Sequence, residues 1–568
     1  MTVMKKTTLR LLPLAAVVSV LFGCGGDDST SPQSSSGPGA GGTTPVAASQ
    51  FTPGNLLVSR STYDAANVVS GTLPFNATPE AANATPITAV TPGTFPNVFT
   101  NDAVDANFGV TSEVLLDQWA PGATSPAKTI DITALAAKSQ INFATSFSSK
   151  SELALNVSRD NKSLTFVAYN SAIDQLDISN SNTPGVVDPT NNDISTPTFR
   201  TVAQLNFADS SMSFTNTNAY SGDNGRAAIL ANGMYYMVGN AGDSGKTPKP
   251  TTALLDTLTT DTGVQSIVPG SSCPFTQVIG AFQSSTGGSY SVAPAGTACS
   301  LATMGTITGG SATGDEFGFS ITSLGQPADK TGKDDNFRGL FDGPDGTVFI
   351  TKGSGGNGVN TVYQVGATGA LGNGGVLPQN AAITIVPGFP TALAANPLPT
   401  SVTGTEFPFS VWIPASNPSI MFVADEGDGT AGNQTTGSGG LWVYQNQNGT
   451  WKALTHLTAG LNLGTAYTVT DTQGVFGTAG ANYTTTPDGL RGITGQTNSD
   501  GSFTIFGTTS TAGNSLGANF DSGADSNQLV KITVNVSGAT ASSTSGFSTL
   551  QTAPFGQVLR GVAIVPGA

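Results

Sequence analysis

Four arginines recur in one short pattern, in which each is followed by a small residue and then by apolar residues. They are Arg226, Arg338, Arg491 and Arg560. A guanidinium group is planar and donates several N–H hydrogen bonds, so it binds carboxylates and phosphates in a forked arrangement. The repetition predicts four equivalent positions and a cationic site for an anionic ligand. The alternative, which the nearby acids Asp223, Asp335 and Asp488 favour, is that each arginine forms a salt bridge and ties strands together.

A glycine-rich acidic loop, residues 425–429, is the second candidate site. Asp425, Glu426 and Asp428 offer hard oxygen ligands of the kind that calcium prefers, although their spacing is not that of an EF-hand. Asp425, Glu426 and Asp488 also offer a carboxylate pair for general acid–base catalysis. A solvated loop without a ligand is the third interpretation.

His456 is the only histidine, and this excludes metal sites built from several histidines. A Ser-His-Asp triad would have to use His456, yet no Gly-x-Ser-x-Gly turn accompanies it. It follows an apparent strand at 451–454, so we expect a packing or loop role. The glycine runs lack a following helix and are typical of loops rather than of phosphate-binding motifs. The sequence therefore contains no complete catalytic constellation.

The composition bounds both the fold and the partners. The formal net charge is −15 and no basic stripe is present, so the surface should repel nucleic acid. Charged residues make up only 10% of the chain, whereas Gly, Thr, Ser and Asn dominate. Thr- and Val-rich segments between Gly, Asn and Asp turns predict an all-β protein. Residues 132–139 are the best candidate for a helix, and that helix would be short.

Internal repeats predict the architecture. An Asp-Gly or Asn-Gly turn, as at Asn232-Gly233 and Asp500-Gly501, repeatedly joins two apolar strands, because these residues tolerate the positive φ of tight hairpins. The Arg pattern often precedes the hairpin, and two further strands follow it. About seven such four-stranded units recur, which is typical of a β-propeller. They lie near 54–130, 145–207, 220–268, 274–325, 333–388, 405–458 and 486–537.

The last strand of the chain has no unit after it. Residues 558–565 repeat the signature of a first strand, so we expect them to pair with the N-terminal unit around 56–59 and to close the ring. Closure would remove open sheet edges. The rival fold is two or more β-sandwich domains in series, but no Pro-rich linker divides the middle of the chain.

With these turns and Arg-Gly-apolar strands, the body resembles exported bacterial propellers of the broad NHL and YVTN-like group. The resemblance is diffuse and covers most of residues 51–568. The group includes binding modules, lactonase-like enzymes and members with no known role. The resemblance therefore implies an architecture and not an activity.

The N-terminus predicts export and a lipid anchor. Lys5, Lys6 and Arg10 precede an apolar run that is too short to span a bilayer. The run closes on Leu21-Phe22-Gly23-Cys24, which resembles the bacterial lipobox with Cys24 as the lipidated residue. The alternative is ordinary cleavage beside a stray cysteine. Residues 25–50 lack large apolar side chains and predict a disordered stalk. We expect anchoring in the bacterial cell envelope, at the outer membrane or cell surface.

The other two cysteines, Cys273 and Cys299, predict a disulfide in an oxidising compartment, worth about 3 kcal/mol in the chain-entropy model. Two buried free thiols are the alternative.

Three functional hypotheses follow from these features. The first is a binding or scaffold propeller for a protein or a small anionic ligand. The second is a metal- and carboxylate-dependent hydrolase or lyase that works at the mouth of the channel, and the third is a purely structural surface protein.

Overall fold

The computed structural model is built almost entirely from short antiparallel strands. All the residues that it describes belong to one compact unit, Ala47–Ala568. They are residues 51–63, 71–73, 87–89, 110–147, 149–176, 178–184, 196–241, 263–280, 336–354, 358–379, 381–394, 404–429, 437–472, 479–513 and 523–567. The predicted signal peptide and stalk, with Cys24, lie outside the described residues, as does Cys299.

The strands form six sheets of four or more strands in the described part of the chain, numbered here from the N-terminus. Sheet 1 contains β30 (Gln557–Ile564), β1 (Leu56–Thr62), β5 (Val114–Trp119) and β6 (Lys128–Asp131). Sheet 2 contains β8 (Asn156–Val157), β9 (Ser163–Tyr169), β10 (Arg200–Asn206) and β11 (Met212–Thr217). Sheet 3 contains β12 (Gly225–Ala231), β13 (Met234–Gly239), β14 (Gly263–Ile267) and β15 (Gln277–Ile279).

The second half of the chain repeats this arrangement. Sheet 4 contains β16 (Leu340–Asp342), β17 (Val348–Lys352), β18 (Thr361–Val365) and β19 (Ile383–Ile385). Sheet 5 contains β20 (Pro408–Trp412), β21 (Ile420–Asp425), β22 (Gly440–Gln447) and β23 (Thr450–Leu457). Sheet 6 contains β24 (Tyr467–Thr470), β25 (Asn482–Thr497), β26 (Phe503–Gly513), β27 (Gln528–Ser537) and β28 (Thr540–Ser542), with β29 (Ser548–Thr552) beside β27.

A few elements lie outside these sheets. Two small antiparallel sheets of two strands each pair β2 (Gly71–Leu73) with β3 (Ile87–Ala89) and β4 (Thr111–Ser112) with β7 (Thr145–Ser146). The predicted short helix is α1 (Ile132–Lys138), which begins where the Asp131 side chain accepts a hydrogen bond from Ala134 N. No helix in the described ranges is long and apolar enough to cross a membrane.

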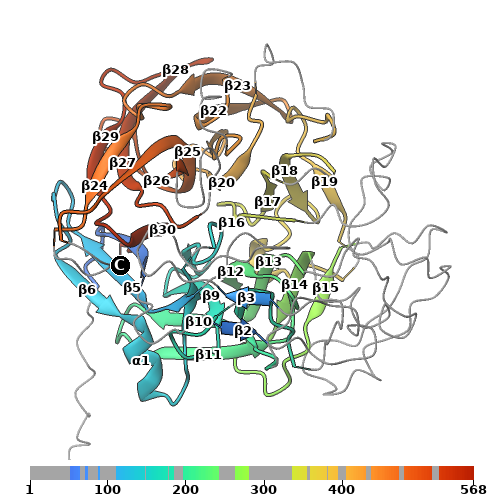
Figure 1. Ribbon diagram of the computed structural model, residues 1–568. Helices are drawn as coiled ribbons and strands as arrows, with labels where there is room; N and C mark the ends of the chain where they lie inside the picture. The colour runs from blue at the N-terminus through green and yellow to red at the C-terminus, as the bar shows by residue number, and fades with distance from the viewer. Residues whose placement is uncertain are drawn as a thin grey trace, which may run out of the picture. The chain divides into compact units, whose positions relative to one another are not determined.

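The six sheets are arranged in a ring, in the manner of a β-propeller (Figure 1). Six buried apolar clusters each combine side chains from two neighbouring sheets. Successive side chains of a strand point to opposite faces, so one strand feeds two clusters. Shared clusters are exemplified, in ring order, by Leu116 with Phe166, Val167 with Met237, Val238 with Tyr363, Phe349 with Val423, Phe422 with Ile505, and Leu529 with Val58. The last pair joins sheet 6 to sheet 1 and completes the ring.

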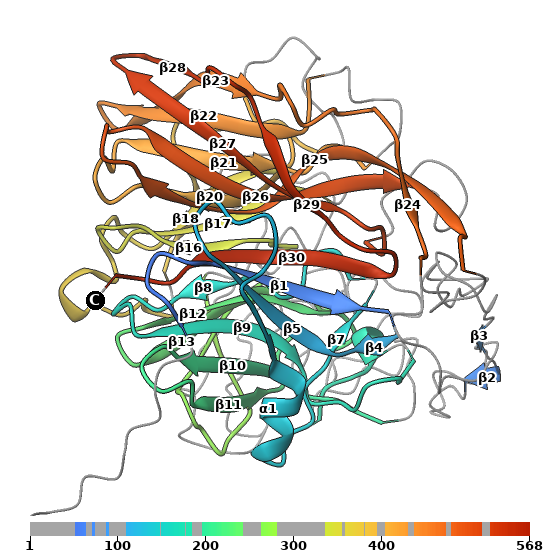
Figure 2. The same cartoon turned by 90° about the vertical axis from the view of Figure 1, so that its left-hand side faces the viewer.

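The last strand, β30, closes the ring by pairing with the first, as predicted. The two strands are antiparallel, with Val58 opposite Val562, and they lie side by side in Figure 2. Sheet 1 is therefore built from both ends of the described chain. The all-β class and the propeller-like ring are confirmed by this arrangement.

The expected number of units is not reproduced in full. Six of the seven predicted units correspond to sheets, whereas the unit near 274–325 has no sheet of its own among the described residues. Its residues 277–279 form β15, the last strand of sheet 3, and residues 281–335 lie outside the described part of the chain.

Five strands, β30, β8, β12, β16 and β20, stand at one edge of their sheets, and β25 takes the same place in sheet 6, where β24 pairs only with its first residues. These six are called the inner strands below. In sheets 1, 4 and 6, a hydroxyl on the neighbouring strand accepts a hydrogen bond from an inner-strand glycine and donates one to the next sheet. These hydroxyls belong to Ser59, Thr351 and Thr508, which donate to the carbonyl oxygens of Leu153 (2.8 Å), Phe409 (2.6 Å) and Arg560 (2.7 Å).

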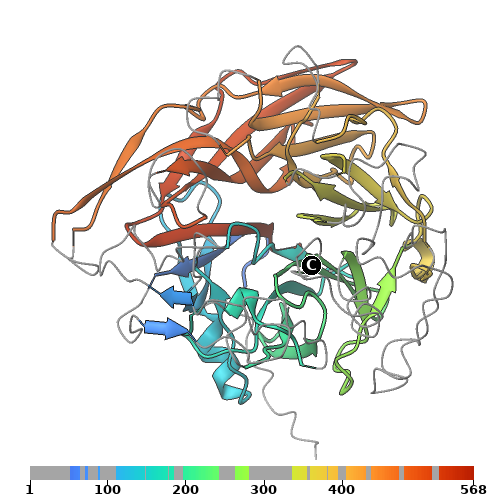
Figure 3. The ribbon, with the colours of Figure 1, turned by 45° about the vertical axis from the view of Figure 1, so that its right-hand side comes forward.

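The glycines explain the Arg-Gly pattern. A Cβ at Gly339, Gly492 or Gly561 would lie 2.3, 2.9 or 2.4 Å from a backbone oxygen of the adjacent inner segment. Only glycine permits so close an approach of two backbones. The glycine of the pattern is therefore required by the packing of the ring. Because the arginine directly precedes that glycine, its backbone position in the ring is fixed as well. One further feature, the hairpin of β24 with the first half of β25, extends away from the other sheets (Figure 3).

Candidate functional site

A cavity of about 550 Å³ lies between the inner strands. Its lining includes residues from all six sheets, among them Val562, Val157, Ile229, Phe341, Val411 and Ile493. The cavity is therefore the central space of the ring. At one end its walls carry Lys150, Glu152, Arg491 and Arg560, and Arg338 adjoins the lining residue Gly339. We call this part of the cavity the arginine end.

The four predicted arginines occupy repeated positions on the inner segments. Arg226 lies in β12, Arg338 directly precedes Gly339, Arg491 lies in β25 and Arg560 in β30. Their exposed fractions are only 3 to 6%. In the two remaining sheets, Leu153 and Phe409 take the position, because their carbonyl oxygens accept the same inter-sheet bond as that of Arg560. In sheet 3 the corresponding acceptor is Ala228, two residues after Arg226, so the four arginines lie around one axis without being strictly equivalent.

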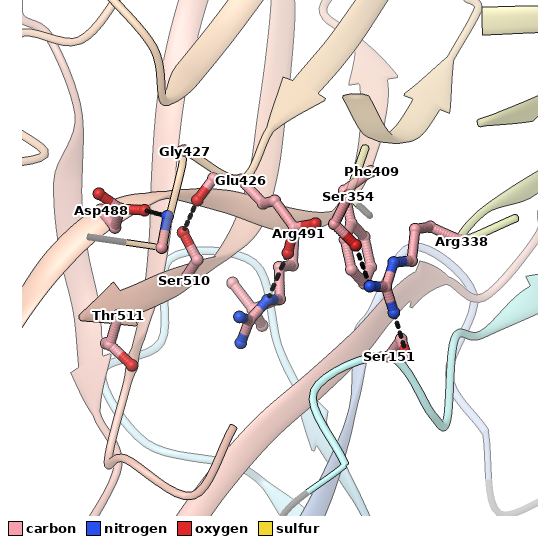
Figure 4. A network of polar contacts seen from close by, with 12 residues as sticks. Ser151, Arg338, Ser354, Phe409, Glu426, Gly427, Asp488, Arg491, Ser510 and Thr511 are labelled. Atoms are coloured by element: carbon pink, nitrogen blue, oxygen red, sulfur yellow. Dashed lines mark hydrogen bonds and ion pairs between the residues drawn. The ribbon is translucent and has the colours of Figure 1, made fainter. Parts of the chain in front are cut away.

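Two of the arginines have acidic partners. Arg226 Nη2 lies 3.9 Å from Asp223 Oδ1, the acid expected from the sequence, and Arg226 Nη1 donates to Phe337 O at 2.8 Å. Arg491 Nε lies 3.3 Å from Glu426 Oε2 (Figure 4). Asp488, the acid expected from the sequence, also attracts Arg491: burial lowers the pKa of Arg491, and the charges of Glu426 and Asp488 oppose this shift.

The partner of Arg491 comes from the neighbouring sheet for a local reason. The Asp488 carboxylate already accepts a hydrogen bond from Gly429 N at 2.8 Å. It is therefore engaged with the loop that follows β21. The same loop starts with Glu426, whose side chain is buried and reaches Arg491 from sheet 5. The packing of sheet 5 against sheet 6 thus brings Glu426 to Arg491 in addition to the acid on the same strand.

The other two arginines form no salt bridge with any acid among the described residues. Arg338 donates to Ser151 Oγ at 3.0 Å and to Ser354 Oγ, and its Nε has no partner (Figure 4). Arg560 donates to Phe147 O, while its Nε and Nη1 have no partner. A buried donor without a partner costs about 1–3 kcal/mol, more if it is charged. Asp335, the acid expected beside Arg338, lies outside the described residues.

The crowding of cations is visible in the pKa values. Burial lowers the pKa of Arg226 to about 9, and the positive charge of Arg338 adds to the effect. Burial also lowers the pKa of Arg560 to about 9, with a contribution from Arg491. Because arginine keeps its proton in proteins, these shifts express the cost of burying the cations, to which their mutual repulsion adds, rather than a loss of charge. An anion at this end would reduce that cost.

Lys150 belongs to the same cluster, although it was not among the residues expected from the sequence. Burial lowers its pKa to about 8, Glu426 raises it by attraction, and Arg338 and Arg491 lower it further by repulsion. Lys150 lies in the segment that leads into β8, the inner strand of a sheet without an arginine at the repeated position. Charged residues are scarce in this chain, so a lysine and a glutamate two residues apart, directly before an inner strand, could have indicated a charged site.

Glu152 was also missed. Its carboxylate accepts hydrogen bonds from Thr145 Oγ1 at 2.7 Å, Ser146 N at 2.9 Å and Tyr169 OH at 2.5 Å. Burial raises its pKa, and these three bonds together with the charge of Arg560 act in the opposite direction. The charge of Glu152 attracts Arg560 and raises its pKa, but the two side chains do not form a salt bridge.

The predicted calcium loop is organised differently. Asp425 is fully buried, and its carboxylate accepts hydrogen bonds from Thr405 Oγ1, Gly427 N and Gly439 N at 3.0–3.1 Å, and from the backbone of residues 406 and 407. It therefore fastens two loops. Glu426 is directed to Arg491 instead, and Asp428 is only partly buried. Among the described residues, no group of three or more His, Cys, Asp or Glu side chains is placed to hold a metal ion. Calcium binding stays a prediction.

His456 has a packing role, as expected, although it lies in β23 rather than in a loop. Its ring stacks on Trp442 with centroids 4.1 Å apart and planes 6° apart, and its Nε2 is 2.7 Å from Gly439 O. Burial lowers the pKa of the imidazole. Of the predicted disulfide pair, Cys273 is buried, and its partner Cys299 is not among the described residues.

Comparison with known proteins gives no shortcut to the function. No family model matches the chain, and no curated protein matches it either.

Proposed function

We propose that this protein is a binding module that takes a small anionic ligand at the arginine end of its central cavity. The observation that carries the proposal is the pair Arg338 and Arg560, which are buried without a salt bridge to any described acid. Each also has at least one N–H donor without a partner. An anion would supply both the missing charge and the missing acceptors.

A scaffold role is the alternative that a specific observation favours. Arg226 and Arg491 connect neighbouring sheets, through Phe337 O and through Glu426. If all four arginines served only the ring, however, Arg338 and Arg560 would be expected to have comparable acidic partners. The hydrolase or lyase alternative has less support, because Glu426 and Asp488 are each bound to another group.

We also propose that the ring belongs to the NHL and YVTN-like propellers and that Cys24 anchors it to the cell envelope. The basic residues, the short apolar run and the lipobox-like sequence before Cys24 support the anchor. Metabolic labelling of the expressed protein with a palmitate analogue tests it. Label that is lost in Cys24→Ala supports the anchor, and equal labelling of both proteins overturns it.

The ligand proposal is tested by thermal unfolding of a chain that starts near Gln50, with a panel of anions. A ligand that binds only the native state stabilises it by about 2.7 kcal/mol at a concentration of 100 Kd. We expect at least one anion to raise the melting temperature of the wild type but not of Arg560→Met. The matched control is Arg60→Met, since Arg60 is buried but salt-bridged to Asp117 at 2.7 Å. A flat response of the wild type to all the anions would overturn the proposal.

A further inference from the structure

We propose that the anion bound at the arginine end is a dianion with oxygens on opposite sides, namely the phosphoryl group of a phosphate monoester. This inference rests on the proposed function and names its ligand class. It follows from three features of the described residues, which are the number of arginines without a salt bridge, the directions from which they come, and the size of the cavity.

The first feature is charge. Arg226 and Arg491 are compensated by Asp223 and Glu426. Glu152 attracts Arg560 through its charge, and the buried Lys150 adds another cation. Arg338 and Arg560 themselves form no salt bridge with a described acid, and they leave two buried guanidinium groups without an ion-pair partner. A monoanion would neutralise only one of them. A phosphoryl group carries a charge of about −1.5 to −2 at neutral pH and offers three strong acceptor oxygens.

The second feature is direction. Arg560 comes from sheet 1 and Arg338 from sheet 4, and in a ring of six sheets these two lie opposite each other. Arg491 arrives from sheet 6, and Lys150 from the segment before sheet 2. A planar carboxylate presents its acceptors in one plane and suits a single guanidinium fork. A tetrahedral group presents oxygens to donors on all sides of the axis.

The third feature is room. The cavity of about 550 Å³ is far larger than a phosphoryl group needs, since a water molecule takes about 30 Å³ in the liquid. Beyond the arginine end its lining includes the apolar residues Leu155, Val411 and Val562. The remaining space therefore suits the organic part of a monoester. In the ligand-free ring the unpartnered N–H atoms are covered, and rotation of the long arginine side chains would bring them to the ligand.

The test is a calorimetric titration of the chain that starts near Gln50 with inorganic phosphate, sulfate, succinate and acetate. At about pH 7.5 we expect phosphate and sulfate to bind at least about tenfold more tightly than acetate or succinate. Acetate that binds as tightly as sulfate would overturn the dianion. Succinate that binds most tightly would overturn the tetrahedral group in favour of two carboxylates. In both cases the proposed function, anion binding, survives. If none of the anions binds, both the proposed function and the inferred ligand class are overturned.

The same titration at a lower pH distinguishes a change in the charge of the ligand from a change in the charge of the protein. Lowering the pH to about 5.5 converts phosphate largely to its monoanion but leaves sulfate a dianion. We expect phosphate to lose affinity by about threefold or more relative to sulfate. The protein groups that face the site and titrate or carry charge beside the four arginines are Lys150, Glu152, Asp223, Glu426 and Asp488. Their titration affects both anions alike, so an unchanged ratio of the two affinities would contradict the inference.

Variants tie the result to the two arginines. Arg338→Met and Arg560→Met should each reduce phosphate affinity at least tenfold and should narrow the gap between sulfate and acetate. Arg60→Met should leave both affinities unchanged, because Arg60 is neutralised by Asp117 within sheet 1. Should a variant fold poorly, the anion ratios of the wild type at the two pH values still decide the question.

Discussion

The acidic loop and the arginine end are both dense in buried charge, yet they are satisfied to opposite degrees. The Asp425 carboxylate accepts five hydrogen bonds, most of them from backbone N–H groups of two loops. Arg560, equally buried, has one partner and two unpartnered N–H positions. A charge whose bonds are complete holds the structure together, and a charge whose bonds are incomplete is available to a ligand. The sequence marked both regions as candidate sites, and only their hydrogen bonding separates them.

The largest effect is expected for Asp425→Ala. The substitution leaves five buried or partly buried donors without their acceptor, so the free energy of unfolding should fall by about 4 kcal/mol. Chemical denaturation measures it. The anion affinity of the molecules that remain folded should not change. A stability loss below about 1 kcal/mol would show that the loops do not depend on Asp425, and it would contradict the structural role that the comparison gives to the acidic loop.

A smaller effect is expected for Glu426→Gln, which should lower the stability of the fold but raise its affinity for sulfate. Loss of the carboxylate leaves Arg491 without its ion pair, so the unfolding free energy should fall by about 3 kcal/mol. The same change makes the arginine end more positive, so sulfate should bind about tenfold more tightly and restore part of the lost stability. Denaturation with and without sulfate measures both effects. Weaker sulfate binding in this variant would contradict the assignment of the site.

Arg560→Met should act in the reverse direction on stability. It removes a buried cation that has no salt bridge, while keeping an apolar chain of similar length. We expect the unfolding free energy in the absence of anions to rise by about 1 kcal/mol. Arg60→Met is the control, and it should lose stability because Asp117 is left buried without its cation. Equal losses in the two variants would mean that Arg560 is as well satisfied as Arg60.

The smallest effect concerns pH. The pKa of Lys150 is lowered to about 8 in the folded protein, from an ordinary value of 10.5. Between these two values the unfolded chain binds the proton more strongly than the folded one, so this group makes stability rise with pH across that window. Lys150→Met should make the rise shallower, as measured by urea unfolding at several pH values. An identical slope would place Lys150 outside the charged cluster.

The features that were predictable from sequence are those with a local cause. Asn232 and Gly233 take φ values of 50° and 80°, and Ala231 pairs with Met234, as an Asn-Gly hairpin requires. The pairing of β30 with β1 was also predictable, because Arg560-Gly561 repeats the pattern of a first strand at the end of the chain.

The choice of partners across the ring was not predictable in the same way. Asp488 is three residues from Arg491 in sequence and was expected beside it, whereas the ion pair at 3.3 Å with Glu426 of the neighbouring sheet was not expected. Lys150 and Glu152 belong to the site because the segment before β8 comes to lie beside β30, with Ser59 bound to Leu153. Such contacts depend on how six sheets meet around one axis, and no repeat in the sequence encodes them. The assignment of β15 to sheet 3 has the same cause.

The most direct test of the central claim is a crystal structure of the protein grown with tungstate, a tetrahedral dianion that is located by its anomalous scattering. We predict a peak in the central cavity within hydrogen-bond distance of both Arg338 and Arg560, with their guanidinium groups turned towards it. A cavity without the anion, with tungstate bound only on the outer surface or not at all, would contradict the claim that the arginine end is a binding site.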